Sequence, residues 1–404
     1  MKNTKMPTIR FKGFNDDWEQ RKFGDLGSVA MCKRVFKEQT TPVGEIPFYK
    51  IGTFGAEPDA FISRELFEEY KSNFQYPNVG DMLISASGTI GRTVEYSGEE
   101  AYFQDSNIVW FKHDDRIDNS FLRCIYNIVK WNGIEGSTIK RLYNDNFLKT
   151  EFYMPTAGEQ AKIGAYFRSL DHLITLHQRK LEKIKLMKKS MLGKMFSRDA
   201  ESIPKIRFDG YTDDWEQRKL EEVCSEIGDG LHSAPEYDDN GKSFFINGNN
   251  LINGHIVINS NETKRVSENT FEKNNKQLDD NTVLLSINGT IGNLAYYQGE
   301  PVMLGKSAAY LKANKIDKTF LYSLLQTTAV MNNFMLSLTG TTIKNLGLDA
   351  IKKTKISIPK LREQERIGLY FSQLDHLITL HQRKLEKLKK VKKSLLEHMF
   401  PMEK

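Results

Sequence analysis

The sequence contains an internal repeat of about half its length, and this repeat limits the possible folds more than any other feature of the chain. Four segments recur in the same order: PTIRFKGFNDDWEQRK at Pro7 and PKIRFDGYTDDWEQRK at Pro204, LISASGTIG at Leu83 and LLSINGTIG at Leu284, GSTIKRL at Gly136 and GTTIKNL at Gly340, and LDHLITLHQRKLEK at both 170–183 and 374–387. A period of about half the 404 residues is too long for a solenoid unit. It fits a domain with an attached element, present in two copies.

Between the repeated segments the two copies hardly resemble each other. GEIPFYKIGTFGAEPDAF, from Gly44, and GKSFFINGNNLINGHIVI, from Gly241, both indicate short strands broken by Gly, Asn and Pro turns, yet their side chains differ almost throughout. GTIG itself lacks the spacing of a dinucleotide fingerprint and indicates a turn after a buried strand. The pattern predicts one scaffold that carries two different surfaces.

Each copy ends in a stretch that contains no proline and that predicts one long helix, from Glu159 to about Phe196 and from Glu363 to about Phe400. Apolar positions recur at intervals of four and three residues, the period of a coiled-coil seam. The seam positions are Leu170, Ile174, His177, Leu181, Ile184, Lys188, Met191 and Met195 in the first helix, and Leu374, Ile378, His381, Leu385, Leu388, Lys392, Leu395 and Met399 in the second. The natural partner of each helix is the other one, and each would span roughly 55 Å.

Polar residues interrupt this seam at matching places. His177 and His381 suggest a metal site or a switch, but a polar residue at one heptad position more often fixes register and pairing. We expect Lys188 and Lys392 to extend outward from the seam. The lysine-rich ends of both helices either touch phosphate or form a solvated face.

Charge and composition exclude some classes of protein and leave others open. The formal charge of +6 permits a polyanionic partner without requiring one. Three widely separated cysteines without CxxC spacing argue against a disulfide framework and a zinc site. The N-terminal residues have no apolar signal segment, and the most apolar stretch is interrupted by Gln326, Asn332 and Asn333. We therefore expect a cytoplasmic protein that does not cross a membrane.

Catalytic motifs are mostly missing. No two prolines are adjacent and no cysteine follows proline, so the chain lacks the signature motifs of amino-methyltransferases and of cytosine-5 methyltransferases. Both Gly-Lys-Ser sequences lack the first glycine of a phosphate-binding loop. Pro58-Asp59 followed by Glu69 and Lys71 fits the short pattern of Mg²⁺-dependent nucleases, and this leaves a nuclease as an alternative. The same residues are also explained as ordinary surface residues of a helix.

The pattern as a whole resembles the specificity subunit of Type I restriction-modification systems. The resemblance rests on two divergent segments, each followed by Gly-Ser/Thr-Thr-Ile-Lys, then Met154-Pro155 or Ile358-Pro359, Glu-Gln and a long helix, and it covers essentially the whole chain. It implies an α+β fold with two α/β target recognition domains in a pseudo-two-fold repeat, joined by two long helices that form an antiparallel coiled coil. The implied divisions are recognition domains at residues 1–157 and 201–360, and conserved helices at 158–200 and 361–404.

The resemblance also implies a function and a set of partners. Each recognition domain would recognise one half of a bipartite site in double-stranded DNA, and the helices would set the spacing of the halves. Two modification subunits would dock on the helices and restriction subunits would join them. Methylation and cleavage, with S-adenosylmethionine, ATP and Mg²⁺, would belong to these partners, so the chain itself would have no catalytic residue, metal or cofactor. A coiled-coil scaffold without nucleic acid is the other alternative.

Base recognition in the major groove requires amides, hydroxyls, Lys and Arg on loops, whereas contacts to phosphate only position the protein. In the first domain the base-contact candidates are Tyr49, Lys50, Thr53, Ser85, Ser87 and Arg92, and the phosphate candidates are Ser137, Thr138, Lys140 and Arg141. In the second domain the base-contact candidates are Asn247, Asn249, Asn250, Asn253, Ser286, Asn288 and Asn293, and the phosphate candidates are Thr341, Thr342 and Lys344. Turn chemistry is the competing explanation for each Asn.

Docking of the modification subunits would use residues beside the seam. The candidates are Leu173, Leu176 and Lys180 in the first helix, and Leu377, Leu380 and Lys384 in the second. These leucines equally suit closure of the core between the two helices.

Overall fold

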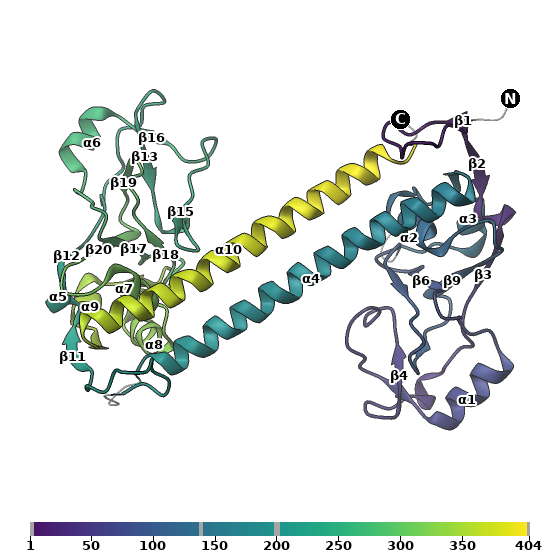
Figure 1. Cartoon of the computed structure of the whole chain (residues 1–404), viewed down its shortest axis with the longest axis horizontal. Coiled ribbons are helices and arrows are strands. Elements are labelled where there is room, and N and C mark those ends of the chain that lie inside the picture. The colour runs from purple at the N-terminus through teal and green to yellow at the C-terminus, as the bar shows by residue number, and fades with distance from the viewer. Residues whose placement is uncertain (1–3, 137–139, 198–202, 402–404) are drawn as a thin grey trace. The chain divides into compact units, whose positions relative to one another are not determined.

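The structure is a computed structural model that describes residues 4–136, 140–197 and 203–401 (Figure 1). By internal contacts the chain divides into two compact units, and each takes part of both long helices. Unit 1 comprises Met1–His177 with Lys384–Lys404, and unit 2 comprises Gln178–Arg383. The four predicted divisions of the chain stay a prediction, because the contact-based division cuts across both helices.

Unit 1 is built on a four-stranded antiparallel sheet in the order β3-β9-β6-β7. A three-stranded sheet, β5-β4-β8, carries the divergent segment, and β1-β2-β10 forms a third sheet. The strands are β1 (Thr4–Lys5), β2 (Trp18–Lys22), β3 (Gly27–Ala30), β4 (Ile46–Tyr49), β5 (Phe61–Ile62), β6 (Met82–Ser85), β7 (Thr93–Glu95), β8 (Tyr102–Phe103), β9 (Ile108–His113) and β10 (Glu151–Met154). The short helices are α1 (Arg64–Asn73), α2 (Asn119–Ile128) and α3 (Asn144–Lys149).

Unit 2 repeats the four-stranded sheet as β12-β20-β17-β18 and the three-stranded sheet as β16-β13-β19. β11 pairs with β23, and two small hairpins, β14-β15 and β21-β22, complete the unit. The strands are β11 (Glu216–Lys219), β12 (Cys224–Asp229), β13 (Ser243–Ile246), β14 (Leu251–Ile252), β15 (His255–Ile256), β16 (Arg265–Val266), β17 (Thr282–Ser286), β18 (Leu294–Tyr296), β19 (Val302–Leu304), β20 (Ala308–Ala313), β21 (Leu338–Thr339), β22 (Asn345–Leu346) and β23 (Lys355–Ile358). The helices are α5 (Leu220–Val223), α6 (Glu268–Asn274), α7 (Lys318–Leu324), α8 (Thr328–Leu336) and α9 (Leu348–Lys353).

The same local chemistry starts matching helices in the two units. Asp118 caps α2 by accepting from the backbone N–H of Ser120 and Phe121, and Asp317 caps α7 by accepting from that of Phe320. An acceptor at this position satisfies backbone donors that the first helical turn leaves unpaired. The repeat therefore preserves the helix start even where the sequence around it has changed.

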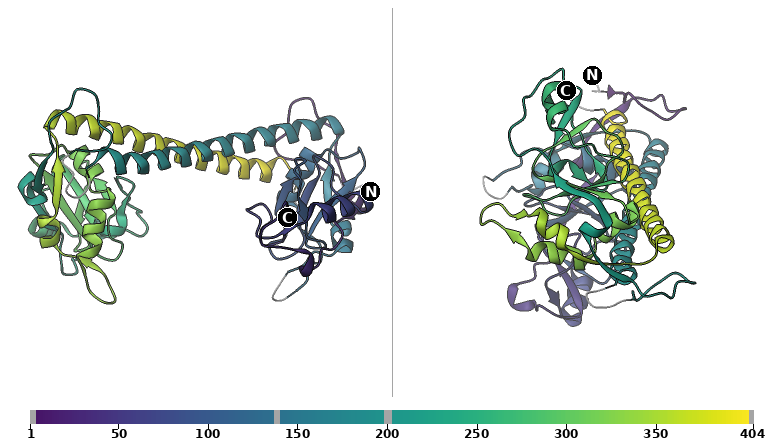
Figure 2. Two further views of the ribbon diagram at one scale, coloured as in Figure 1. Left: turned by 90° about the horizontal axis from the view of Figure 1, so that it is seen from below. Right: turned by 90° about the vertical axis from the view of Figure 1, so that its left-hand side faces the viewer.

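The predicted long helices are α4 (Ala157–Met195) and α10 (Leu361–His398), and the predicted α+β class with two repeated domains is confirmed. Within each unit α4 and α10 lie side by side and antiparallel (Figure 2). Leu170, Leu181 and Met195 in α4, and Leu374, Leu385 and Met399 in or just after α10, are buried, as their seam positions predict. His177 and His381 are half-buried, and their role in register stays a prediction.

The prediction that Lys188 and Lys392 extend outward is wrong. In unit 2 the Lys188 Nζ lies 2.5 Å from Asp375 Oδ1, and in unit 1 the Lys392 Nζ lies 2.5 Å from Asp171 Oδ1. Each ammonium turns toward a carboxylate of the other helix because the side-chain reach of lysine allows it and burial favours a paired charge. The two ion pairs are equivalent, since the aspartates are second residues of the two LDHLITLHQRKLEK segments.

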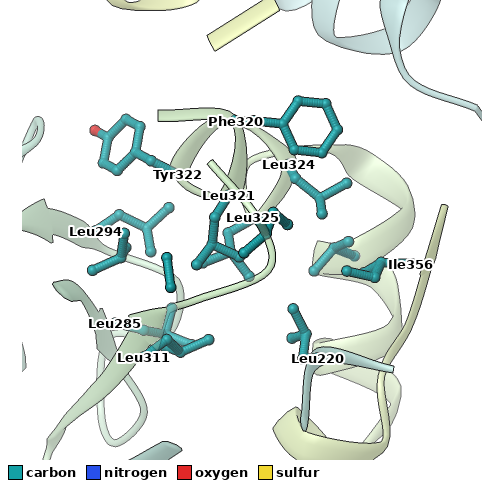
Figure 3. Close-up of a cluster of buried hydrophobic side chains, with 14 of the residues drawn as sticks. Leu220, Leu285, Leu294, Leu311, Phe320, Leu321, Tyr322, Leu324, Leu325 and Ile356 are labelled. Atoms are coloured by element: carbon teal, nitrogen blue, oxygen red, sulfur yellow. The ribbon is translucent and has the colours of Figure 1, made fainter. Parts of the chain in front are cut away.

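Each unit has its own buried core. In unit 2 leucines from three strands of the four-stranded sheet converge on α7 and on residues of α5 and β23 (Figure 3). Leu321 and Leu325, both 0% exposed, hold the end of α7 against that sheet. In the described part of the chain, none of the helices combines the length and the apolar character that a membrane span requires.

Candidate nucleic-acid interface

In each unit two loops with repeated motifs lie against each other, the GTIG turn and the GSTIK or GTTIK segment. In unit 1 the backbone N–H of Gly88 donates to the Lys140 carbonyl at 2.9 Å, and in unit 2 that of Gly289 donates to the Lys344 carbonyl at 3.2 Å. A second backbone bond follows in both units, from Leu142 to Ala86 and from Leu346 to Ile287. We call this pairing of the GTIG turn with the GSTIK or GTTIK segment the frame junction. The sequence showed both motifs but not that they meet.

Ser85 and Ser286 build the turn of the frame junction. Ser85 is 1% exposed and its hydroxyl accepts from the backbone N–H of Arg92 at 2.9 Å, while Ser286 is 0% exposed and accepts from that of Asn293 at 2.7 Å. Buried hydroxyls with such partners stabilise a turn. The proposed base contacts of these two serines stay a prediction, and the described structure gives both a local role. Ser87 is also buried, at 5% exposed.

The other base-contact candidates of unit 1 lie around the end of β4. Tyr49 is half-buried and stacks on Phe103, with ring centroids 5.9 Å apart, and burial raises the pKa of its phenol. Lys50 Nζ lies 2.8 Å from Asp59 Oδ1, and Thr53 Oγ1 accepts from the Lys50 backbone N–H at 3.1 Å. The structure brings these three together, and the polar ends of Lys50 and Thr53 are engaged with neighbours in the same loop.

The remaining candidates of unit 1 are basic. Arg92 is exposed, and its Nη1 donates to the Phe54 carbonyl at 2.9 Å. Lys140 and Arg141 are exposed at the frame junction. Ser137 and Thr138 lie outside the described residues. Exposed cationic side chains of this kind attract phosphate.

In unit 2 three of the predicted amides line one concave surface of about 360 Å³, and we call it the asparagine hollow. Asn247 Oδ1 accepts from Ser307 Oγ at 2.9 Å, and Asn250 Nδ2 donates to the Val257 carbonyl at 3.0 Å, so both fix the shape of the hollow. Asn249 is exposed between them. An exposed amide can present a donor and an acceptor together to a base edge.

The hollow also contains aromatic residues that sequence reasoning missed. Tyr237 and Phe245 form an edge-to-face pair with centroids 6.2 Å apart, and Lys264 Nζ lies 4.8 Å from the centre of the Tyr237 ring. Aromatic rings and cations next to amides are common where proteins contact nucleotides. In the sequence Phe245 is one residue of a short apolar strand, with nothing to mark it as a binding residue. The fold shows that it lines the hollow and contacts Tyr237.

The other asparagines have different surroundings. Asn253 adopts the left-handed conformation, with φ of 50°, in the turn that joins β14 to β15. Its turn role therefore fits the competing explanation given above. Asn288 Nδ2 donates to Asn345 Oδ1 at 3.4 Å at the frame junction, and Asn293 is half-buried there.

The phosphate candidates of unit 2 are exposed on the β21–β22 hairpin. Thr341, Thr342 and Lys344 surround Ile343, which is 62% exposed. Gly340 turns the hairpin with φ of 89°, a conformation that other residues rarely adopt. Hydroxyls and an ammonium on a projecting turn can reach a phosphate backbone.

The nuclease pattern is not assembled. Asp59 pairs with Lys50, Glu69 is exposed on α1, and Lys71 Nζ lies 5.1 Å from the Phe67 ring and 5.3 Å from the Tyr76 ring. Among the described residues no group of three His, Cys, Asp or Glu could hold a metal ion. The carboxylates that would bind Mg²⁺ therefore do not converge.

One repeated contact explains the Glu-Gln motif at the start of each long helix. Glu159 accepts two hydrogen bonds of 2.7 Å from the guanidinium of Arg10, and Glu363 accepts two of 2.7 Å from that of Arg207. Glu159 is 0% exposed and Glu363 is 1% exposed. The carboxylate of Glu159, hydrogen-bonded to the guanidinium, raises the pKa of Arg10. These arginine clamps bind the first repeated segment of each unit to its long helix, and the arginines were missed by the sequence reasoning although both lie in repeated segments.

A comparison with protein families assigns the chain. The family model described as the Type I restriction modification DNA specificity domain matches residues 15–186 and 212–390. The chain belongs to this family. It carries the specificity domain twice, and the matches confirm the resemblance that the repeats suggested.

Individual relatives agree with this assignment. A putative type I restriction enzyme specificity subunit of Haemophilus influenzae is 55% identical over 156 residues, which cover 38% of this chain and 40% of the relative. A putative type I restriction enzyme MjaX specificity subunit of Methanocaldococcus jannaschii is 22% identical over 94% of this chain and 92% of the relative. The crystal structure of a Type I restriction-modification S subunit from M. genitalium covers 99% of this chain and 100% of its own with a TM-score of 0.68 at 16% identity, a likeness of fold.

Membership in the family settles the class of function. Specificity subunits are the components that recognise DNA sequence, and they are not the catalytic ones. The family has no catalytic cofactor of its own, and its members act in a complex with DNA and other subunits. The nuclease and scaffold alternatives are not favoured.

Proposed function

We propose that this chain selects the DNA site of a Type I restriction-modification complex, with each unit recognising one half of a bipartite sequence. The observation that carries the proposal is that both units keep the frame junction and the arginine clamp, while the segments around β4 and β13 differ. Two domains that recognise different half-sites need the same scaffold and different loops on it. The long helices would set the distance between the two half-sites.

Within each unit the proposed division of labour follows exposure. The exposed Lys140, Arg141 and Lys344 of the frame junction contact phosphate, because a contact common to both units carries no sequence information. Asn249 in unit 2 and Arg92 in unit 1 are exposed candidates for base edges, and Asn253, which is also exposed, has a turn role instead. The buried Ser85 holds the turn that carries Arg92, and the buried Ser286 holds the turn that carries Asn293.

The partners in the proposal are two modification subunits on the long helices and restriction subunits that join them. Leu173 and Leu176 are 42% and 37% exposed, and Leu377 and Leu380 are 41% and 46% exposed. This exposure supports docking of a partner on these leucines rather than closure of the core between the helices. They occupy identical positions in the repeated segment, so the same partner surface fits both. S-adenosylmethionine, ATP and Mg²⁺ serve the partners, and the complex works in the cytoplasm.

A domain exchange tests the half-site assignment. Residues 210–357 are replaced by the matching segment of another specificity subunit, the hybrid is expressed with its modification subunits, and methylated bases are mapped in the host genome. One half of the motif changes and the other half is retained. A motif in which both halves change, or neither, contradicts the assignment.

A pair of single substitutions sharpens the test within unit 2. Asn249→Ala relaxes the requirement at one or two base pairs of the second half-site, since a bidentate amide contact contributes about 1–3 kcal/mol of discrimination. The matched control is Asn253→Gly, which suits the left-handed turn and leaves the motif unchanged. Equal effects of the two substitutions would remove Asn249 from the base contacts.

A further inference from the structure

The loop that follows β3 carries an arginine that the sequence-based candidates did not include. Arg34 Nε donates to Asp105 Oδ2 at 2.8 Å, and the two side chains are 60% and 16% exposed. This bond uses the inner nitrogen of the guanidinium. Among the described residues neither Nη1 nor Nη2 of Arg34 has a hydrogen-bond partner. The two outer nitrogens therefore keep their N–H donors for a ligand.

The core fixes the backbone on both sides of Arg34. Cys32 is 2% exposed and belongs to a buried cluster that includes residues of β4, β6 and β8, and Val35 packs against the same cluster. The carboxylate of Asp105 is mostly shielded from water and holds the guanidinium at one end. A side chain restrained in this way loses less conformational freedom when it binds, so Arg34 is preorganised.

The turn that carries Asp105 joins the two groups of candidates in unit 1. The preceding residue, Gln104, donates its backbone N–H to the Tyr49 carbonyl at 2.9 Å, at the end of β4. Asn107, at the other end of the turn, accepts from the backbone N–H of Ala86 at 2.8 Å, and Ala86 belongs to the frame junction. The turn therefore ties Arg34 to the surface that already contains the candidates for base and phosphate contacts.

Unit 2 has a different side chain at the place of Arg34. His232 lies four residues after Gly228 in β12, as Arg34 lies four residues after Ala30 in β3, and these two strand residues occupy matching places in the four-stranded sheets. His232 Nε2 lies 2.7 Å from Oδ2 of Asp229 in its own loop. An imidazole has no pair of outer donors like that of a guanidinium. The two units therefore differ here in the chemistry that they offer to a base.

The free donors of Arg34 fit one base better than the others. In the major groove guanine presents two adjacent acceptors, O6 and N7, whereas adenine presents a donor beside its N7 and cytosine presents a donor. A planar guanidinium that donates from both outer nitrogens matches the two acceptors of guanine, and this is the commonest specific contact of arginine with DNA. A contact to phosphate would need neither the fork nor a carboxylate that orients it.

We propose that Arg34 recognises a guanine in the half-site of unit 1, with Nη1 and Nη2 donating to O6 and N7, and that Asp105 is the positioning residue of this contact. The inference rests on the proposed function, because it takes unit 1 to recognise one half-site. It adds to that function the base that is recognised and the atoms that recognise it. The half-site of unit 2 has no such contact from the matching loop, where His232 stands.

Base analogues test the contact in the wild-type complex of this chain with its modification subunits. The half-site of unit 1 is the one that is retained when residues 210–357 are exchanged. Each guanine in either strand of that half-site is replaced in turn by 7-deazaguanine, which lacks the N7 acceptor, and binding is measured by fluorescence anisotropy. At one position the affinity falls at least about fivefold. Inosine at that position changes it less than about twofold, because inosine keeps O6 and N7 and lacks only the amino group in the minor groove.

Substitutions in the chain assign the effect to Arg34. Arg34→Lys keeps the charge but removes the fork, so methylation mapping shows a motif that tolerates other bases at this position, while affinity for non-target DNA is unchanged. Asp105→Asn lowers the ratio of affinities for guanine and 7-deazaguanine DNA and also leaves binding of non-target DNA unchanged. The matched control is Arg64→Lys, since Arg64 is exposed in the same unit and its outer nitrogens are bound to Glu100. Its motif stays that of the wild type.

Three results would overturn the proposal. The first is a half-site of unit 1 in which no guanine is sensitive to 7-deazaguanine. The second is an unchanged motif in Arg34→Lys, and the third is equal relaxation of the motif by Arg64→Lys. The titration with analogues uses the wild-type complex, so it decides the question even where a variant fails to assemble. The domain exchange leaves Arg34 in place, so failure of the half-site assignment is detected separately.

Discussion

The arginine clamp offers a test of what holds the repeated scaffold together. Glu159→Gln keeps the size of the side chain but removes its charge, and it turns one acceptor of the Arg10 guanidinium into a donor. Breaking a buried ion pair on one side costs about 3–5 kcal/mol. The Arg10 side chain is 13% exposed and can recruit water, and glutamine keeps one acceptor, so we expect a loss somewhat below this range, about 2–3 kcal/mol.

Hydrogen exchange of the full-length chain measures this loss unit by unit. A change of about 2 kcal/mol raises the exchange rate of globally protected amides about 30-fold. We expect the increase in unit 1 peptides that cover β2, α2 and the start of α4. Glu363→Gln produces the same change in unit 2, where Arg207 has the same geometry.

An exposed pair with two hydrogen bonds provides the control. Arg64 donates to both oxygens of Glu100 at 3.0 Å, but the two side chains are 46% and 54% exposed. Glu100→Gln therefore leaves the exchange rates of unit 1 nearly unchanged, since water screens the pair. If Glu159→Gln cost no more than Glu100→Gln, burial would not be what makes the clamp strong, and the reasoning would be refuted.

Three further predictions concern the helices, the frame junction and the thiols. Asp375→Leu destabilises unit 2 in urea unfolding by about 2–4 kcal/mol, because the Lys188 ammonium loses its carboxylate and, among the described residues, keeps only Gln326 Oε1 as a hydrogen-bond partner. Adding Lys188→Met recovers most of the loss, and a double variant as unstable as the single one would contradict this. Lys344→Ala weakens binding to target and non-target DNA alike and lowers the slope of log affinity against log salt by about 0.9, whereas a loss confined to the target sequence would make Lys344 a base contact. The three cysteines are buried, and burial raises the pKa of each thiol to about 12, so a thiol reagent at pH 8 labels them only at the rate of unfolding; rapid labelling of the native chain would refute their burial.

The architecture was predictable because its signals are periodic or repeated. A seam of period 3.5 over the 26 residues of 170–195, and again of 374–399, has few alternatives to a long paired helix, and α4 and α10 begin and end within two residues of the expected limits. Lys188 and Lys392 were misjudged for a physical reason. We expected each ammonium to point outward because water would be its best partner. The carboxylates that bind the two ammonium groups instead lie about 190 and 220 residues away in sequence, so no local pattern could indicate them.

The candidate site was less predictable, because the exposure of each side chain decides whether it is available to contact DNA. Ser85 and Ser286 match the residue types that contact bases, yet each hydroxyl accepts a hydrogen bond from the backbone N–H seven residues later and so closes a turn. Asn249 and Asn250 are neighbours in sequence, but one is exposed while the other bonds to the Val257 carbonyl. Residue type predicts what a side chain can bind, and only the fold shows which atoms are left for a ligand.

The way the frame junction is bonded explains how such different surfaces can share one scaffold. The cross-loop bonds that both units share run between backbone groups, at Gly88 and Lys140 in one unit and at Gly289 and Lys344 in the other. Backbone bonds do not depend on the side chains that point to solvent, so exposed residues of the adjoining loops can change without loosening the junction. The side chains that cannot change are the ones that face inward, the turn serine and the clamp pair, and these are the ones that the two copies retain. Separation of the bonds that hold the loops from the groups that meet the ligand lets one fold recognise two sequences.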